Sequence, residues 1–466
     1  MDRTRLSKWM GIVVGTALLS ACPPVDPSDP DGGTDAGVVA DTDVVVARFD
    51  SSGQLDTSFG SQGIAQVDLG SGQGTVRDTV WDLAVDAQDR LVVFGSARAG
   101  EARDDWDRTV LRLTAQGAVD TSFAQGGIHV LDLGGLSDNP KGGFVQADGK
   151  IVSSGYAAQP SGAGAQTANA IVLLRLNEDG TPDSTFGYQG VVNSNPYLSP
   201  LENTPAGFAE AYGVGRQSSG AYVTAGYGKP TAAQSKVDVI SARYTPAGVL
   251  DSTWATEGVF TLDLIGDNDR ARNVLVLPDD RVLLVGSGIQ AVGDIDAMAV
   301  LLTADGAPAS GLGEGGPLLT DFQRPDEAFF DAAVSPDGQW VAAVGYRAGA
   351  VAGVTEDDDS LLLLWPTAGG APTALAVELS NTASDRLWAV TFDAQGRVLA
   401  AGFLDQGGDT RMVLVRFLSD GTLDPAFGTA GIAQLNVVES GNVEAARAVA
   451  VQSDGKIVIA GVAETR

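Results

Sequence analysis

Short apolar runs separated by polar turns fill almost the whole chain, and seven of these runs end in a glycine at regular intervals. Residues 80–85 and 90–95 are strand-like runs of this kind. The glycines recur at steps of 57 to 71 residues: Gly95, Gly155, Gly226, Gly286, Gly345, Gly402 and Gly461. A unit of this length cannot bury both of its faces alone, so the period predicts units stacked in a ring or a solenoid.

One unit is clear between residues 80 and 133. Residues 80–85 and 90–95 flank the turn Ala87-Gln88-Asp89 and predict a β-hairpin. After a variable loop, residues 109–113 and 128–133 predict a second pair of strands. Each unit therefore holds four strands, which we call A, B, C and D in chain order.

A distinctive string lies between strands C and D, first as Leu55-Asp56-Thr57-Ser58-Phe59-Gly60 followed by Gly63-Ile64. Its echoes begin at Val119, Pro182, Leu250 and Leu423. On these residues the chain resembles the delta-60 repeat, a β-propeller family of exported bacterial proteins. The resemblance covers residues 42–466 and implies a propeller fold without assigned catalytic residues. Copies near Pro308 and Pro372 lack the aspartate and the aromatic residue, so we expect two irregular units there.

The number and order of the strand pairs predict how the units close. Seven A–B pairs and seven C–D pairs can be counted, but the chain opens with a C–D pair and ends with an A–B pair. We therefore predict an all-β fold, a seven-bladed β-propeller of four-stranded blades. A two-plus-two clasp between residues 44–69 and 446–462 would close the ring and hide the edge strands. An open solenoid would leave both half-units unpaired.

The N-terminus has the organisation of an export signal. Arg3, Arg5 and Lys8 precede a short apolar stretch, and Leu19-Ser20-Ala21-Cys22 follows. This resembles the lipobox of bacterial lipoproteins, which implies cleavage before Cys22 and attachment of lipid to it. A secreted protein with a chance cysteine is the alternative.

These features give three expected regions: a signal peptide (1–21), a lipidated cysteine with an acidic Pro/Gly tether (22–41) and the propeller (42–466). We expect a membrane contact through the lipid anchor at the bacterial cell envelope. Pro23 after the cysteine, in place of an aspartate that retains some lipoproteins at the inner membrane, favours the outer membrane.

Charge and rare residues limit the function classes. A formal net charge of −30 disfavours nucleic acid as a partner. The single histidine, His129, and the single cysteine cannot build a metal or nucleophile constellation, so we expect no catalysis and no cofactor. We also expect a monomer. Acidic runs at residues 104–107, 267–269, 294–296 and 356–359 leave bound calcium as an alternative to simple solvation, although none has EF-hand spacing.

Aspartates recur five residues before one position of strand C. Asp43, Asp107, Asp238, Asp296 and Asp359 precede Arg48, Arg112, Arg243, Leu301 and Leu364. Because a feature repeated in most units is structural before it is functional, we interpret these aspartates as caps at the start of a strand, some of them paired with the arginine.

The binding site is expected where the units differ. The A–B and C–D turns are uniform, whereas the B–C and D–A loops, on the opposite face, vary. Four aromatic residues follow the period glycine on that face: Tyr156, Tyr227, Tyr346 and Phe403. They are our candidate binding face, with packing between blades as the alternative. In strand A, Trp81 and Trp388 share the sequence parity of Leu83 and Val390, so we expect these two to fill the space between blades.

The sequence thus predicts a lipid-anchored envelope scaffold that binds an unknown protein, peptide or glycan. The alternatives are an envelope enzyme, a lyase or a lactonase-type hydrolase with channel carboxylates, and a purely structural surface protein.

Overall fold

The computed structural model divides the chain into two units, Met1–Val39 and Ala40–Arg466. The structure describes residues 41–70, 77–98, 105–134, 137–160, 167–197, 207–231, 234–265, 267–291, 293–312, 316–348, 358–380, 384–439, 441 and 443–464. The predicted signal peptide, Cys22 and all of the tether except Asp41 lie outside these ranges. Within these ranges no helix is long and apolar enough to cross a membrane.

The described residues form 28 strands, which fall into the four positions expected from the sequence. The A strands are β3 (Asp78–Val85), β7 (Asp138–Val145), β11 (Phe208–Arg216), β15 (Arg270–Val276), β19 (Asp326–Val334), β23 (Asp385–Phe392) and β27 (Ala445–Val451). The B strands are β4 (Leu91–Arg98), β8 (Ile151–Pro160), β12 (Tyr222–Lys229), β16 (Val282–Ala291), β20 (Trp340–Ala348), β24 (Val398–Asp405) and β28 (Ile457–Glu464).

The C strands are β1 (Thr42–Phe49), β5 (Trp106–Leu113), β9 (Thr167–Leu176), β13 (Asp238–Tyr244), β17 (Asp294–Leu302), β21 (Asp359–Pro366) and β25 (Thr410–Phe417). The D strands are β2 (Ile64–Val67), β6 (Ile128–Leu131), β10 (Val191–Ser194), β14 (Val259–Leu262), β18 (Leu318–Thr320), β22 (Thr373–Val377) and β26 (Ile432–Leu435).

The strands pair antiparallel in the order A, B, C, D. Five sheets have four strands, and a sixth has eight strands whose two halves meet at one parallel bridge between Ile295 and Asp326. One four-stranded sheet, β2-β1-β28-β27, joins strands from both ends of the described chain, with Thr42 opposite Glu464. An all-β fold made of several four-stranded antiparallel sheets is that of a β-propeller.

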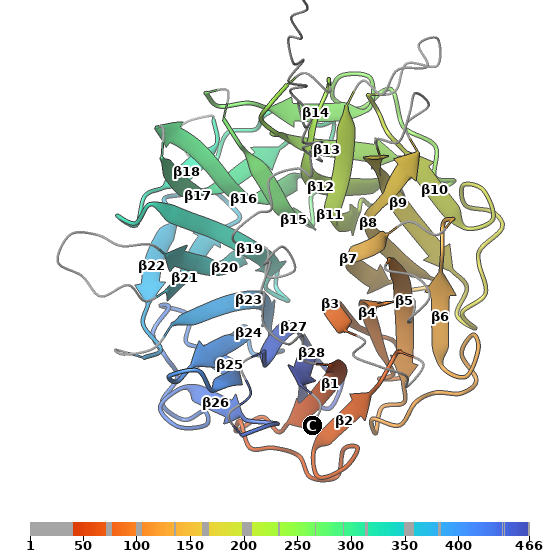
Figure 1. Ribbon diagram of the computed structural model, residues 1–466. Coiled ribbons are helices and arrows are strands. Elements are labelled where there is room, and N and C mark those ends of the chain that lie inside the picture. The colour runs from red at the N-terminus through yellow and green to blue at the C-terminus, as the bar shows by residue number, and fades with distance from the viewer. Residues whose placement is uncertain are drawn as a thin grey trace, which may run out of the picture. The chain divides into compact units, whose positions relative to one another are not determined.

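The A strands lie innermost and the D strands outermost (Figure 1). Each A strand contacts the A strand of the next sheet, from β3 through β27 and back to β3. Apolar clusters lie between neighbouring sheets; for example, Val46 and Val458 of one sheet pack with Leu91 and Leu111 of the next. Because the sheets cover one another, strands B and C are buried on both faces, as in the buried run Leu91–Ala97.

The string between strands C and D joins neighbouring sheets. Asp56 forms an ion pair with Arg48, whose Nε atom lies 2.9 Å from Oδ2 of the aspartate. The guanidinium of Arg48 lies 4.8 Å from the ring centroid of the buried Phe59. The amide of Gly60 donates to the carbonyl of Gln116 in the next sheet.

The pairing expected for some of the aspartates at the start of strand C does not occur at Asp43, because Arg48 pairs with the aspartate of the string. The same pairing recurs in four other units: Arg112–Asp120, Arg175–Asp183, Arg243–Asp251 and Arg416–Asp424. The two units that lack the string aspartate carry Leu301 and Leu364 in place of the arginine.

Candidate functional site

Every A strand contains a β-bulge at the same register position. In β3, Val80 lies opposite Gly95 and Asp82 opposite Phe94, so Trp81 has no partner in the ladder. The same shift leaves out Lys141, Tyr212, Arg272, Phe330, Trp388 and Arg447. We call these seven residues the bulge ring. A bulge bends the strand and turns the extra side chain out of the regular alternation.

The bulge explains the glycine period in the sequence. A Cβ atom on Gly95 would lie 2.2 Å from the carbonyl oxygen of Thr79, and one on Gly402 would lie 1.8 Å from that of Arg386. The five other period glycines face an A-strand carbonyl at 1.8–1.9 Å in the same way. Only glycine allows this close approach of the two backbones. The strongest signal in the sequence therefore marks the site where each A strand bulges.

The side chains of the bulge ring form a nearly continuous series of aromatic and cationic contacts. Nζ of Lys141 lies 3.1 Å from the ring centroid of Trp81 and 5.0 Å from that of Tyr212, and Arg272 lies 5.2 Å from Tyr212. Cation–π attraction acts at these distances.

The other half of the ring continues this arrangement. Phe330 stacks on Trp388 at 4.1 Å. Cζ of Arg447 lies 4.0 Å from the centroid of Trp388 and 5.7 Å from that of Trp81. Trp81, Phe330, Trp388 and Arg447 are partly exposed, whereas the other three members are buried. We call these four residues the accessible arc.

Trp81 and Trp388 each contact the A strands on both sides of their own, as packing between blades requires, but the argument from parity that led to this expectation is wrong. It assumed an uninterrupted alternation along strand A, but the bulge changes the parity. Val80 and Leu83, three residues apart, belong to the same buried cluster between two sheets, which an unbroken strand would not allow. The tryptophan between them leaves that cluster and joins the ring.

Three of the four candidate binding residues pack against the bulge ring. Tyr156 stacks on Tyr212 at 6.1 Å, and the hydroxyl of Tyr227 lies 2.8 Å from that of Tyr212. Tyr346 stacks on Phe330 at 5.2 Å.

Exposure separates these residues. Tyr156, Tyr227 and Phe403 are partly exposed. Tyr346 is completely buried, with the guanidinium of Arg386 4.0 Å from its ring centroid. A buried ring cannot contact a partner, so Tyr346 supports Phe330 and is not part of a binding face. Phe403 lies opposite Arg386 in the ladder.

Two carboxylates directly follow bulged residues, and the sequence did not single them out. Asp82 accepts the amide of Leu83 at 2.7 Å and that of Gly143, in the next sheet, at 2.9 Å. Asp331 accepts the amides of Ala332 and Val390, both at 2.8 Å. Burial raises the pKa of Asp82 to about 7 and that of Asp331 to about 6. Each aspartate thus hydrogen-bonds its own strand and the next sheet.

Six A strands carry a buried acid three residues before the bulged residue. These acids are Asp78, Asp138, Asp269, Glu327, Asp385 and Glu444. Each accepts a backbone amide from the segment that follows the preceding D strand, as Asp78 does from Leu69 at 2.6 Å. The signal in the sequence, an acid 17 or 18 residues before the period glycine, was present but was missed.

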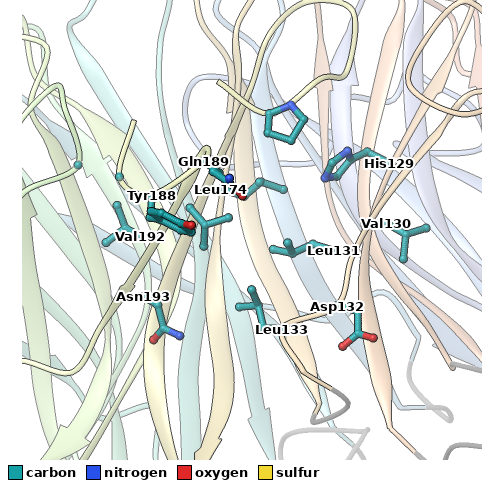
Figure 2. Close-up of a pocket in the computed structure, with 14 residues that line it drawn as sticks. His129, Val130, Leu131, Asp132, Leu133, Leu174, Tyr188, Gln189, Val192 and Asn193 are labelled. Atoms are coloured by element: carbon teal, nitrogen blue, oxygen red, sulfur yellow. The ribbon is translucent and has the colours of Figure 1, made fainter. Parts of the chain in front are cut away.

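A groove of about 770 Å³ lies between β6 and β10. Figure 2 shows Leu131 and Leu133 on one side and Tyr188 and Val192 on the other. His129 also lines the groove, and its Nε2 atom is buried without a hydrogen-bond partner. Burial lowers the pKa of His129. The groove is mainly apolar and brings the imidazole no second histidine.

Comparison with known proteins supports the fold. Residues 32–59, 146–186 and 396–427 match the family described as "Domain of unknown function (DUF5122) beta-propeller". No curated protein matches the chain.

Solved structures resemble the chain only distantly. The extracellular domain of a one-component system from B. thetaiotaomicron is 11% identical with a TM-score of 0.39, and the match covers 84% of this chain but 38% of that one. A protein of unknown function from Dyadobacter fermentans is 12% identical with a TM-score of 0.39, and the match covers 84% of this chain and 99% of that one. Sqt1 of Chaetomium thermophilum, bound to the N-terminus of ribosomal protein L10, is 14% identical with a TM-score of 0.41. The match covers 83% of this chain and 97% of that one. Likeness at this level supports no inference about function.

Proposed function

We propose that this chain is a lipid-anchored, seven-bladed β-propeller of the bacterial cell envelope that binds a partner and catalyses no reaction. The observation that carries the proposal is the accessible arc, in which Arg447 lies between the indole rings of Trp81 and Trp388. Aromatic residues and arginine are the side chains most enriched at binding hot spots. The seven residues of the bulge ring include no histidine, carboxylate, serine or cysteine.

The seven-bladed, closed form is supported by the contacts between A strands, which return from β27 to β3. The pairing of β1 with β28 supports a clasp between the two ends of the described chain. In this proposal the eight-stranded sheet counts as two blades, because its halves share a single bridge.

The chemistry of the arc favours an anionic ligand with flat apolar faces. A guanidinium group binds carboxylates in a planar, two-pronged geometry, and indole rings stack on flat surfaces. An acidic peptide and a uronate-containing glycan both combine these features. The arc offers such a ligand a local cation on a protein whose net charge is −30.

An envelope enzyme, a lyase or a lactonase-type hydrolase, is the second candidate. Asp82 and Asp331 favour it, because their raised pKa values of about 7 and 6 lie in the range that general acids and bases need. Both oxygens of each carboxylate already accept hydrogen bonds, chiefly from backbone amides, so a structural role accounts for them as well. A purely structural surface protein would retain no ligand at all.

The membrane anchor rests on the sequence of residues 1–22. Cys22 is the only cysteine, so Cys22→Ala should abolish labelling with palmitate and move the protein out of the membrane fraction. Unchanged palmitate incorporation in this variant would contradict the anchor.

Binding is tested by capture from an envelope extract, with the retained peptides and glycans identified by mass spectrometry. Trp388→Ala and Arg447→Ala should each weaken capture by about tenfold or more. Trp340→Ala is the matched control, because Trp340 is 41% exposed and lies outside the bulge ring. If Trp388→Ala retains the same components as the wild type, the arc is not the binding site.

A further inference from the structure

Acids gather where one sheet leads into the next. Three positions recur at these junctions: an aspartate near the start of strand C, an acid after strand D, and the buried acid at the start of the next strand A. At two junctions one acid from each position converges, so that one carboxylate oxygen from each lies within 4.8 Å of the others. A third group, Asp105, Asp107 and Asp132, takes two of its acids from near the start of strand C, and all three of its members have other partners.

The first junction contains Asp296, Asp321 and Glu327. Asp296 is 5% exposed, and its Oδ1 atom is buried without a hydrogen-bond partner. Glu327 is completely buried and accepts the amides of Phe322 and Arg324, both at 2.9 Å through Oε1. Asp321 is exposed and closes the group from the solvent side.

The second junction contains Asp43, Asp68 and Asp78, which hold the same three positions. Asp78 is 2% exposed; its Oδ2 atom accepts the amide of Leu69, and its Oδ1 atom has no partner. Asp43 accepts the side-chain amide of Gln66 at 2.8 Å. Asp68 is exposed, like Asp321. Both junctions therefore hold a buried, unpartnered carboxylate oxygen beside two further carboxylates.

Within the described chain, the charged groups that influence these buried acids are other acids. Burial raises the pKa of Asp78 to about 8, and Asp68 and Asp43 raise it further. Burial raises the pKa of Glu327 to about 7, with Asp321 and Asp296 acting in the same direction. Three carboxylates without a cation repel one another, so each group calls for positive charge.

Other junctions obtain that charge from the chain itself. Asp359 pairs with Arg347 at 2.8 Å and lies 3.7 Å from Arg324. The charge of Arg108 acts on Asp138 and opposes the effect of burial on its pKa. Within the described residues neither converging group forms such an ion pair with an arginine, so a cation from solution would supply the positive charge.

We propose that Asp296, Asp321 and Glu327 form one calcium site and that Asp43, Asp68 and Asp78 form a second. Calcium takes oxygen ligands at about 2.3–2.6 Å, so two ligands of one ion lie at most about 5 Å apart, which the 4.8 Å grouping satisfies. Magnesium ligands lie within about 4 Å of one another and need stricter geometry. Zinc prefers nitrogen and sulfur ligands, which these groups do not contain.

Each site would join neighbouring four-stranded units. Asp296 belongs to β17 and Glu327 to β19, whereas Asp43 belongs to β1 and Asp78 to β3. A cation that binds only the folded arrangement stabilises it by mass action. The expected consequence is a calcium-dependent increase in thermal stability, independent of any ligand at the bulge ring.

The test uses the full chain after removal of metal with EDTA. Calorimetric titration with CaCl2 should reveal two bound ions, and about 1 mM CaCl2 should raise Tm by about 2–5 °C. Asp321→Asn and Asp68→Asn should each remove one ion, and the double variant should lose both ions and the Tm shift. Both substitutions are at exposed positions, so the fold should tolerate them.

Asp263→Asn is the matched control. Asp263 is exposed and follows strand D like Asp321, but its junction does not bring three acids together within the described chain. This variant should keep both ions and the Tm shift. The proposal is overturned if wild type shows neither binding nor a shift, if Asp263→Asn loses as much as Asp321→Asn, or if MgCl2 produces an equal shift.

Discussion

The carboxylates of the C–D loops and those of the junctions have pKa values shifted in opposite directions, although both recur in the same four-stranded unit. In the loops, hydrogen bonds from Ser58 hold the pKa of Asp56 well below its usual range, with Arg48 acting in the same direction. At the junctions, burial raises the pKa of Asp78 to about 8 and that of Asp385 to about 7. The loops thus carry charged aspartates paired with arginine, whereas the junctions carry acids whose charge is costly.

This difference indicates which of the two repeated acids, the loop aspartate or the junction acid, stabilises the fold at neutral pH. An ion pair that lies against an aromatic ring, such as that of Arg416 and Asp424 on Phe427, has both of its charges within one unit, although Arg416 also donates to the carbonyl of Ser51 in the neighbouring unit. A junction acid is completed by the next sheet or by solution. Repetition alone, with the loop ion pair in five units and the junction acid in six, could not distinguish them.

The largest loss of stability is expected when strands next to both kinds of acid are removed. Deletion of residues 446–466 removes the strands opposite β1 and should lower the Tm of the whole domain cooperatively, because an exposed β1 edge remains. Calorimetry and far-UV circular dichroism would measure this loss. A transition in which only a small part melts early would instead favour an open solenoid.

Within the loops, the largest single effect is expected from Arg416→Leu. Arg416 and Asp424 are buried and lie 2.8 Å apart, and the next cation, Arg397, lies 3.9 Å from Asp424. Loss of Arg416 therefore leaves the carboxylate without its close partner and should cost about 3 kcal/mol in urea denaturation. Adding Asp424→Asn should recover part of that cost, because the unpaired charge is then gone. The unit with Leu364 carries neither partner and gives the natural precedent. No recovery in the double variant would mean that packing on Phe427, not charge, is what Arg416 supplies.

At the bulge, Gly402→Ala should destabilise the fold by about 2–3 kcal/mol, because its Cβ would lie 1.8 Å from the carbonyl oxygen of Arg386. The same denaturation measurement checks it. Gly316→Ala is the control, since nothing lies within 4 Å of a Cβ at that position. Equal stabilities of the two variants would contradict the link between the glycine period and the bulge.

The smallest expected effect is the pH dependence, measured in EDTA. The folded state raises the pKa of Asp82 to about 7 and that of Glu327 to about 7, above their ordinary values of 3.8 and 4.5. The folded state therefore binds more protons than the unfolded state, and Tm should rise by about 2–5 °C as pH falls from about 8 to about 5.

Below about pH 4 the sign reverses. Hydrogen bonding by Thr253 and the charge of Arg243 keep the pKa of Asp251 below its ordinary value of 3.8, and this stabilisation is lost as the loop aspartates take up protons. A Tm that falls steadily from pH 8 to 5 would show that ionisation of the buried acids does not destabilise the fold.

The sequence allowed much of the fold to be predicted. The period glycines, the turns and the string located the four strand positions, because these features depend on local backbone conformation and on spacing. The A-strand bulge could not be derived from alternation, since a bulge changes parity without leaving an unusual residue at Trp81 or Trp388. The same assumption assigned these two tryptophans to the apolar clusters of Leu83 and Val390 instead of the bulge ring.

The candidate site was predicted in part. Tyr156 and Tyr227 do lie beside the bulge ring, but Tyr346 is buried, because Phe330 and Arg386 cover the two sides of its ring. The converging acids were only partly anticipated: Asp296 lay in an acidic run, whereas Glu327 and Asp78 lie far from it in sequence. Their proximity depends on sheet-to-sheet packing, which spacing along one chain does not contain.

The bulges also bear on how such a protein could change its specificity. Each bulged residue lacks a partner in the ladder, so its identity can vary while strand pairing, turn chemistry and the period glycine stay the same. The residues found there already include indole, phenol, phenyl, ammonium and guanidinium groups. Point substitutions at seven positions could therefore diversify the ring by combination, with no insertion or loop redesign, and gene duplication of single units would supply the starting material.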